Sequence, residues 1–292
     1  MEKAKVYFTR NITSDNLIKI YEALGVDLKG KIGVKVSTGE AGGNNYLKAD
    51  LIGPLVQKLN GTIIECNTAY SGKRNTVEDH MKVAEDHGFT KFANVDIMDA
   101  EGEEKIPCDG KHMKYDIVGT HLKNYDSMLN LAHFKGHTMG GFGGIIKNQS
   151  IGVASRNGKA YIHGAGTTED PNYVWSHLPA QNDFLESMAE AAKAVSDYFK
   201  GNILYIDVMN NLSVDCDCDS NPEDPCMKDI GILASTDPVA IDQACIDLIW
   251  NSNDAGKEHF KERVERQNGR YILPYAESIG LGTTKYELIN ID

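Results

Sequence analysis

The chain has 292 residues, of which 41% are hydrophobic and 25% are charged, as in a folded globular protein. Acidic residues outnumber basic ones by 42 to 30, and the formal net charge of −12 argues against nucleic acid as a partner. The N-terminus lacks the apolar core of a secretion signal, and no apolar run reaches the roughly 18 residues of a membrane helix. We therefore expect a cytoplasmic protein with no membrane partner. The sequence leaves a homo-oligomer open.

Strand and helix patterns alternate along the first hundred residues, which indicates βαβ units and parallel pairing. Short apolar runs predict strands and amphipathic runs predict helices. The expected strands are 3–9, 31–37, 61–67 and 93–100, and the expected helices are 14–25, 47–61 and 76–89.

The second half continues the same pattern. Residues 114–137 predict a strand that leads into polar, irregular chain, and 159–163 predict a short strand before a turn-rich connection. Further expected elements are a helix over 182–201, a strand over 202–210, a helix that Asp237 caps ahead of Pro238, and a charged helix over 256–269.

These elements predict an α/β fold, with a mainly parallel sheet flanked by helices. The turn-rich connection is the candidate boundary between two closely packed lobes. We expect an N-terminal lobe of residues 1–166 that carries a glycine-rich loop, and a C-terminal lobe of residues 167–292 that carries a Cys-x-Cys loop.

Two loops at predicted strand ends are candidates for binding an anion. Gly39, Gly42 and Gly43 lie between a strand and a helix, where backbone N–H groups can face a carboxylate or phosphate. An ordinary turn is the alternative. Lys73 and Arg74 follow the third strand, at the edge of the sheet where ligands bind in open α/β folds. A solvated pair of cations is the alternative for these two residues.

The stretch HFKGHTMGGFGGIIKN, residues 133–148, combines two imidazoles and an amine with very few bulky side chains. His137, Lys147 and the later His163 can donate, accept or bind a metal, whereas His133 beside Phe134 is more typical of a hydrogen-bonded core histidine. The glycines of the stretch would let a ligand approach the backbone: Gly140, Gly141, Gly143 and Gly144.

Three of the six cysteines, Cys216, Cys218 and Cys226, fall within eleven residues on a loop rich in Asp and Pro. Thiolates favour zinc, copper(I) or iron–sulfur centres, and His163, Cys245 or an aspartate would complete the ligand set. The neighbouring carboxylates make a calcium-type loop an alternative, although the twelve-residue EF-hand pattern is absent. An acidic surface loop with idle thiols is the third interpretation.

Three segments carry a resemblance to a known family: FKGHTMGGFGGIIKNQSIGVAS, VDCDC and DIGILASTDPVAIDQACIDLI. They resemble the uncharacterised "Fe–S centre protein" family, domain-of-unknown-function family 362, and the likeness runs from about residue 5 to about residue 285. Many members of that family carry a ferredoxin module after the segment around His163. This chain has no ferredoxin cysteine run, so the resemblance implies no two-cluster electron transfer here.

A more distant resemblance is to the nickel-pincer lactate racemases. The spacing of His137, the Gly-Phe-Gly-Gly run, Lys147 and His163 is similar to a motif in which the first histidine is a catalytic acid or base, the lysine tethers the nickel cofactor and the last histidine coordinates nickel. The second catalytic histidine of the racemases has no counterpart in the loop around Lys73. The resemblance therefore implies a racemase-like scaffold, and it does not imply lactate as the substrate.

Three hypotheses are compatible with these features. The first is a metal-dependent enzyme, in which Lys73, Arg74 and the glycine turn hold a small carboxylate or other anion while His137 moves a proton, as in an isomerisation, with metal near Lys147 and His163. Its second base would be His121 or Lys73. The other two are a redox or structural protein with zinc or iron–sulfur on the three cysteines, and an anion-binding protein without metal. The cofactor is predicted to be a metal ion: nickel, zinc or an iron–sulfur centre.

Overall fold

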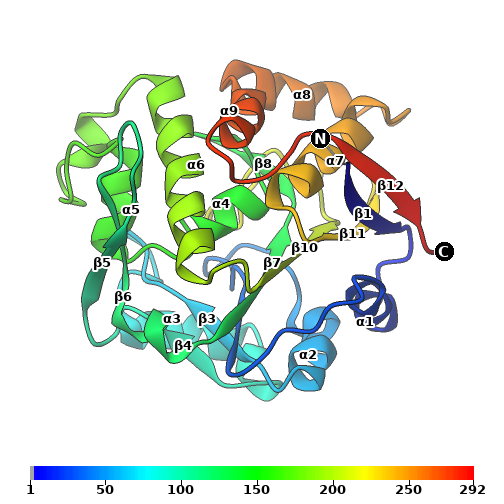
Figure 1. The fold of residues 1–292 in the computed structure, drawn as a ribbon, viewed down its shortest axis with the longest axis horizontal. Coiled ribbons are helices and arrows are strands. Elements are labelled where there is room, and N and C mark those ends of the chain that lie inside the picture. Colours follow the sequence, from blue (N-terminus) through cyan, green and yellow to red (C-terminus); the bar gives the residue numbers. More distant parts are fainter. Residues whose placement is uncertain (1–2) are drawn as a thin grey trace.

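The computed structural model describes residues 3–292, and an eight-stranded sheet forms its centre (Figure 1). Strand β11 runs antiparallel to both of its neighbours, and the other strand pairs are parallel. This confirms the predicted α/β fold with a mainly parallel sheet. In spatial order the strands are β12 (Tyr286–Asn290), β1 (Ala4–Thr9), β11 (Gly231–Ser235), β10 (Ile203–Met209), β7 (Ser127–His133), β2 (Ile32–Lys35), β3 (Thr62–Glu65) and β4 (Val95–Ile97).

Helices cover both faces of the sheet, and each face has its own apolar core. On one side lie α1 (Ser14–Ala23) and α2 (Ala49–Lys58), and α3 (Val77–Asp86) packs beside β4. The opposite side carries α4 (Ile145–Gln149), α5 (Arg156–His163), α6 (Gln181–Tyr198), α7 (Pro238–Trp250), α8 (Lys257–Arg266) and α9 (Ile272–Ser278).

Two small antiparallel ladders and four short 3-10 turns complete the fold. The ladders are β5 (Glu103–Pro107) with β6 (Tyr115–Gly119), and β8 (Lys135–His137) with β9 (Gly141–Gly143). The 3-10 turns are η1 (Phe89–Lys91), η2 (Thr120–Asn124), η3 (Val174–Ser176) and η4 (Gly269–Tyr271).

Local sequence signals account for the start of several helices. Asp237 accepts hydrogen bonds from the backbone N–H groups of Val239 and Ala240, and Pro238 stands in the first turn of α7 as predicted. Thr13 and Thr76 cap α1 and α3 in the same way. These caps explain why the helix boundaries in the first half could be read from the sequence.

Two predicted elements are wrong. Residues 159–163, expected as a strand, belong to α5, because Ser155 caps this helix through the N–H of Gly158. Residues 127–133, expected as irregular chain, form the central strand β7, all of which is buried. Polar residues such as Asn130 disguised it, but the amide of Asn130 donates to the Ile145 carbonyl at 3.0 Å and is therefore tolerated in the core.

Strands from both expected lobes meet in the one sheet. Strand β7, from residues 1–166, pairs in parallel with β10, from residues 167–292, in a register that sets Met128 beside Ile203. The division into these two lobes stays a prediction. Among residues 3–292, none of the helices combines the length and the apolar character that a membrane crossing requires.

Candidate functional site

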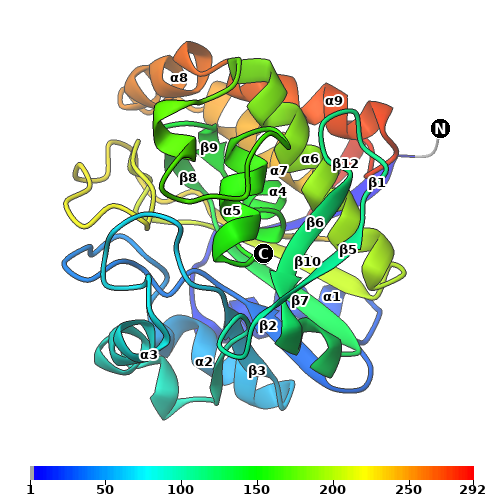
Figure 2. The same ribbon diagram turned by 90° about the vertical axis from the view of Figure 1, so that its left-hand side faces the viewer.

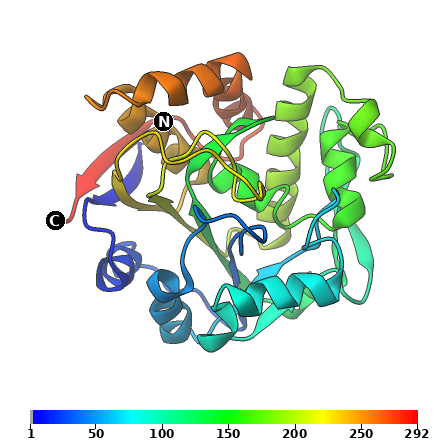
Figure 3. The ribbon, with the colours of Figure 1, turned by 180° about the vertical axis from the view of Figure 1, so that it is seen from behind.

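The parallel strands β2, β3, β7 and β10 end at a common edge of the sheet, and the loops that follow them lie side by side (Figures 2 and 3). These loops contain the glycine turn at 39–43, the Lys73–Arg74 pair, the glycine-rich stretch and the Cys-x-Cys loop. This is the edge at which open α/β sheets bind their ligands.

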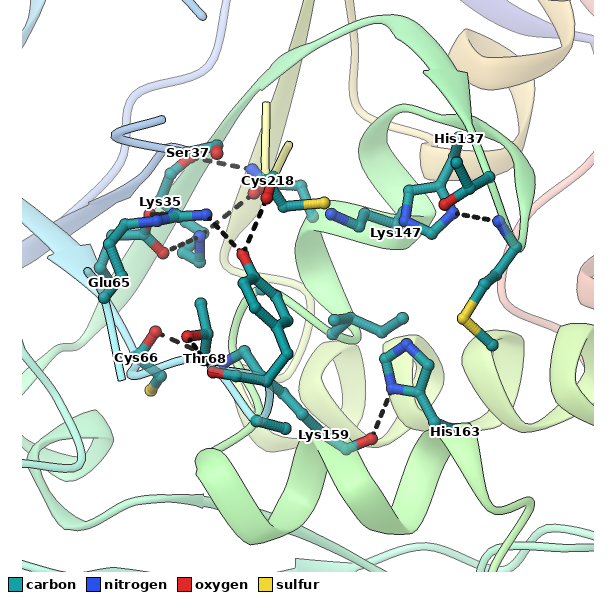
Figure 4. A pocket seen from close by; sticks show the side chains of 18 of the residues that line it. Lys35, Ser37, Glu65, Cys66, Thr68, His137, Lys147, Lys159, His163 and Cys218 are labelled. Atoms are coloured by element: carbon teal, nitrogen blue, oxygen red, sulfur yellow. Dashed lines mark hydrogen bonds and ion pairs between the residues drawn. The ribbon is translucent and has the colours of Figure 1, made fainter. Parts of the chain in front are cut away.

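A cavity of about 190 Å³ opens among these loops (Figure 4). Its wall combines charged, sulfur and aromatic side chains from seven separate stretches of the chain. The residues that the chemistry below uses are Lys35, Glu65, Arg74, His137, Met139, Lys147, Ile151, Lys159, His163, Trp175 and Cys218. An engineered cavity of about 150 Å³ holds benzene, so this one has room for a ligand slightly larger than benzene.

The glycine-rich stretch folds as the hairpin β8–β9 and the short helix α4, and this places His137 and Lys147 on the cavity wall. Its glycines serve close packing within the chain. A Cβ atom on Gly141 would lie 2.9 Å from the Cα atom of Gly269, and one on Gly144 would lie 2.3 Å from the Asp242 carboxylate, which caps α4.

The anion-binding role of these glycines stays a prediction, and at most of them the chain's own groups lie where a side chain would stand. Gly39 lies against the ring of Tyr46, Gly42 and Gly43 lie against the backbone of Ser220 and Asp219, and Gly143 lies near the side chains of Lys135 and Lys147. The turn at 39–43 thus supports the Cys-x-Cys loop, and the Glu40 N–H donates to the Asp217 carbonyl at 2.8 Å.

Asp217, between the two cysteines, fixes the Cys-x-Cys loop to the glycine-rich stretch. Its carboxylate lies 2.7 Å from Nδ1 of His133 and 3.1 Å from Nζ of Lys135, and all three side chains are buried. Burial raises the pKa of Asp217, but the positive charges at His133 and Lys135 outweigh this and hold it well below its usual range. The anchored aspartate turns Cys216 and Cys218 the other way, towards Lys147 and His137.

Cys216 is held as a thiolate. The pKa of its thiol is lowered by a hydrogen bond from Cys218, by the Lys147 ammonium and by His137, against the opposing effect of burial. Nζ of Lys147 lies 3.4 Å from the sulfur. Burial lowers the pKa of Lys147, but the charge on Cys216 raises it above its usual value, so the ammonium persists. The two cysteines share one proton, with the negative charge on Cys216.

The two histidines of the cavity are held in opposite tautomers. Nδ1 of His137 accepts hydrogen bonds from the N–H groups of Met139 and Gly140 at 3.2 and 2.8 Å, which leaves its proton on Nε2. Nδ1 of His163 donates to the Lys159 carbonyl at 2.7 Å, which leaves a lone pair on Nε2. Burial lowers the pKa of both rings, that of His163 to about 3, so both are neutral. His137 is therefore a hydrogen-bond donor and His163 an acceptor.

A buried ion-pair network forms another part of the wall. Glu65 accepts from Lys35 at 2.8 Å and from Arg74 at 3.4 Å, and Arg74 also reaches Glu40 at 3.3 Å. Burial raises the pKa of Glu65, but Lys35, His80 and Arg74 lower it to about 2. Arg74 is thus neutralised by two carboxylates and has less charge to offer a ligand than the sequence indicated.

The structure brings together six of the eight predicted site residues that are not glycine. His137, Lys147, His163, Arg74 and Cys218 line the cavity, and His137, Cys216 and Cys218 have potential ligand atoms within 4.8 Å of one another. These three are the residues that could hold a metal ion here.

Three predicted participants lie elsewhere. Lys73 is exposed on a neighbouring outer cavity, and its N–H donates to Glu40 at 2.8 Å. Cys226 lies outside the metal-capable group, since its thiol donates to the Leu212 carbonyl at 3.3 Å. His121 bonds to Asp96 at 2.7 Å, away from the cavity.

Sequence reasoning missed several residues of the wall, among them Lys35, Glu65, Lys159 and Trp175. The first two carried a readable signal, because each is a charged residue near the end of an otherwise apolar strand. Lys159 and Trp175 carried none, since the segment of Lys159 was taken for a strand and that of Trp175 for a connection.

Comparison with solved structures finds two low-identity neighbours. The lactate racemase apoprotein from Thermoanaerobacterium thermosaccharolyticum shares 13% identity over 70% of this chain and 50% of its own, with a TM-score of 0.42. A crystal structure of a Thermotoga maritima protein shares 11% identity over 87% of this chain and 58% of its own, also with a TM-score of 0.42. The chain thus spans about half the length of these proteins.

No curated protein sequence shows significant similarity to the chain. The profile of the family described as "Domain of unknown function (DUF362)" matches residues 32–247. This range covers the glycine-rich stretch, the Cys-x-Cys loop and most of α7, the three segments on which the family was predicted. The prediction is confirmed, and the chain belongs to the DUF362 family.

Proposed function

We propose that this protein is a metal-dependent enzyme that transfers a proton to or from a small organic anion in the cavity. The observation that carries the proposal is the meeting of Cys216, Cys218 and His137 at the edge of a cavity that also holds Lys147 and His163. Sulfur and imidazole ligands favour zinc, nickel or iron over magnesium or calcium.

The donor set fits a soft metal ion through its two sulfur atoms. His137 fits less well as a ligand, because an Nε2–metal bond would move its proton to Nδ1, where two backbone N–H groups already donate. Its Nε2–H is better placed to donate to the sulfur of Cys216 and to orient that ligand. A metal ion at Cys216 and Cys218 would act as a Lewis acid towards a bound anion.

The remaining groups divide the work of proton transfer. His163 accepts the proton, because its Nε2 lone pair faces the cavity and its other nitrogen is fixed by Lys159. A bound anion would raise the low pKa of His163 towards neutrality, since a nearby negative charge favours the imidazolium. Lys147 stays an ammonium and stabilises negative charge that develops on the substrate. His137, expected from the sequence to move a proton, acts as a fixed donor.

The metal content of purified protein tests the first half of the proposal. Protein would be incubated with nickel, zinc or iron(II), desalted and analysed by mass spectrometry. We expect about one equivalent in the wild type and none in the Cys216→Ser/Cys218→Ser double variant, because both thiolate ligands are then absent. Cys226→Ser is the matched control and should keep the metal. Equal metal in the double variant and the wild type would overturn the assignment.

Hydrogen–deuterium exchange tests the second half. Small aliphatic and aryl-substituted acetates, which carry a C–H bond next to the carboxylate, would be incubated with metal-loaded protein in D₂O, and loss of that proton would be followed by NMR. We expect at least one of them to exchange, and His163→Ala to slow that exchange by about 100-fold or more. Exchange at the wild-type rate in His163→Ala would remove His163 from the role of base.

A further inference from the structure

Lys159 is a buried ammonium group with no anionic partner in the part of the chain that is described. It lies on α5 and is 7% exposed, and Nζ donates to the carbonyl oxygens of Ala154 and Cys66 at 2.5 and 3.5 Å. An ammonium out of water is costly unless a negative charge lies beside it. Two neutral carbonyls meet its hydrogen-bonding needs only in part.

The other cations of the cavity each have an anionic partner. Lys35 pairs with Glu65 at 2.8 Å, Arg74 pairs with Glu40 at 3.3 Å, and Lys147 faces the sulfur of Cys216. Lys159 is the exception among the described cations of this wall. A ligand of charge −1 would balance it, whereas a phosphate dianion would leave a negative charge in excess.

The wall also carries a group of apolar and aromatic side chains. Trp175 packs edge-on against His163 at 5.1 Å between ring centres, and the other face of the imidazole stacks on Phe184 at 5.1 Å. Met139 and Ile151 extend this surface. Trp175 is still 37% exposed, so part of its indole is available to a ligand. Rigid aromatic walls favour flat rings, which bury large areas at little entropic cost.

We infer that the substrate is a small aromatic carboxylate with a C–H bond between its ring and its carboxylate, with the carboxylate on Lys159 and the ring against Trp175 and Met139. The cavity volume of about 190 Å³ suits a single six-membered ring with one substituent. A two- or three-carbon acid would satisfy Lys159 and leave the apolar wall against water. This inference rests on the proposed function, because it takes the cavity to be the substrate site.

Calorimetric titration of the full chain tests this inference with benzoate as the probe. Benzamide has the same ring without the charge, acetate has the charge without the ring, and inorganic phosphate has a higher charge. We expect each comparator to bind at least about tenfold more weakly than benzoate, a difference of about 1.4 kcal/mol. Acetate or phosphate binding as tightly as benzoate would overturn the inference.

Substitutions at Lys159 assign the contact. In Lys159→Met we expect benzoate affinity to fall at least about tenfold and benzamide affinity to stay the same. Lys159→Arg keeps the charge and should restore benzoate binding. Lys193→Met, on the exposed side of α6, is the matched control. Unchanged benzoate affinity in a Lys159→Met variant with a cooperative thermal transition would remove Lys159 from the site.

The Trp175→Ala variant tests the contact between the aromatic ring of the ligand and the indole. It should weaken benzoate and leave acetate unchanged, and equal losses for both ligands would contradict stacking on the indole. The metal content of the same samples separates the two proposals. Benzoate binding without any metal binding would overturn the metal-dependent function and leave the ligand class standing. Metal binding without benzoate selectivity would overturn the ligand class alone.

Discussion

Within residues 3–292, two places gather three side chains of the kinds that bind metal ions. One is the cavity group of His137, Cys216 and Cys218, and the other is a group of His112, which lies between β5 and β6, with Asp183 and Glu186 of α6. In the second group Glu186 is already saturated. Its Oε1 accepts from Tyr271 at 2.7 Å, and its Oε2 accepts from Lys111 and His112, both at 2.7 Å.

The difference between the two groups lies in what surrounds the potential ligand atoms. Around Glu186 three donors occupy most of the lone-pair positions of the carboxylate. At Cys216 and Cys218 the sulfur atoms border a cavity, and the opposed tautomers of His137 and His163 provide one donor and one acceptor. Closeness of ligand-type residues therefore does not make a site. The open volume beside the sulfur atoms distinguishes the cavity group.

The largest expected effect is on stability in acid, where His163 of the cavity and Glu186 should lose their contributions at different pH values. The folded pKa of His163 is lowered from 6.5 to about 3 by burial, so the unfolded chain takes up this proton first and stability falls as the pH drops from 6.5 towards 3. The loss is up to about 1.4 kcal/mol per pH unit. Glu186 has a pKa lowered from 4.5 to about 2, because three donors outweigh the opposing effect of burial, and its contribution is lost only below pH 4.5.

Urea unfolding at several pH values measures this difference. His163→Gln should flatten the slope between pH 6.5 and 4.5, while Glu186→Gln should change it only below pH 4.5. Burial lowers the pKa of His80 to about 3 as well, so some loss of stability in acid should remain in His163→Gln. An unchanged slope in His163→Gln would show that this histidine takes up its proton at an ordinary pH.

Removing Glu186 should cost stability and leave metal binding intact. Glu186→Ala leaves the hydroxyl of Tyr271 and the ring of His112 without their acceptor, and we expect a loss of about 2 kcal/mol in the free energy of unfolding. The metal content should equal that of the wild type. A fall in metal content would make the Glu186 group a metal site and reverse the comparison.

The features of the fold and of the cavity that depend on local sequence patterns could be predicted from the sequence. Alternating apolar runs predicted the parallel sheet, and the spacing of His137, Lys147 and His163 identified residues that do share one cavity. Polar residues inside β7 concealed this central strand of the sheet, because the groups that bond to them in the core come from distant segments. For the same reason Arg74 was read as a free cation, although Glu40 and Glu65 neutralise it. Pairing across the fold is set by tertiary contacts that no local window contains.

A substitution at Lys147 tests whether the cysteines of the cavity group depend on a neighbouring ammonium for their negative charge. Lys147→Met removes the ammonium 3.4 Å from Cys216, so the pKa of the cysteine pair should rise by about one unit or more. Thiolate absorbance in a pH titration reports this change. Cys108 will not interfere, because burial raises the pKa of its thiol to about 12. Superimposable titrations of variant and wild type would mean that the cysteines do not depend on Lys147 for their charge.

The smallest effect is expected at Asp183, the outermost residue of the Glu186 group. Its side chain is 42% exposed and its Oδ1 atom lies 3.7 Å from Nε2 of His112, a distance at which water screens most of the attraction. Asp183→Asn should therefore change the free energy of unfolding by less than about 0.5 kcal/mol, as a surface ion pair does, and should leave the metal content as it was. Cys218→Ser, measured beside it, should lose metal because one of two sulfur ligands is gone. Loss of metal in Asp183→Asn would contradict this prediction. It would mean that Asp183 helps to bind the metal ion although its side chain is exposed and lies 3.7 Å from His112.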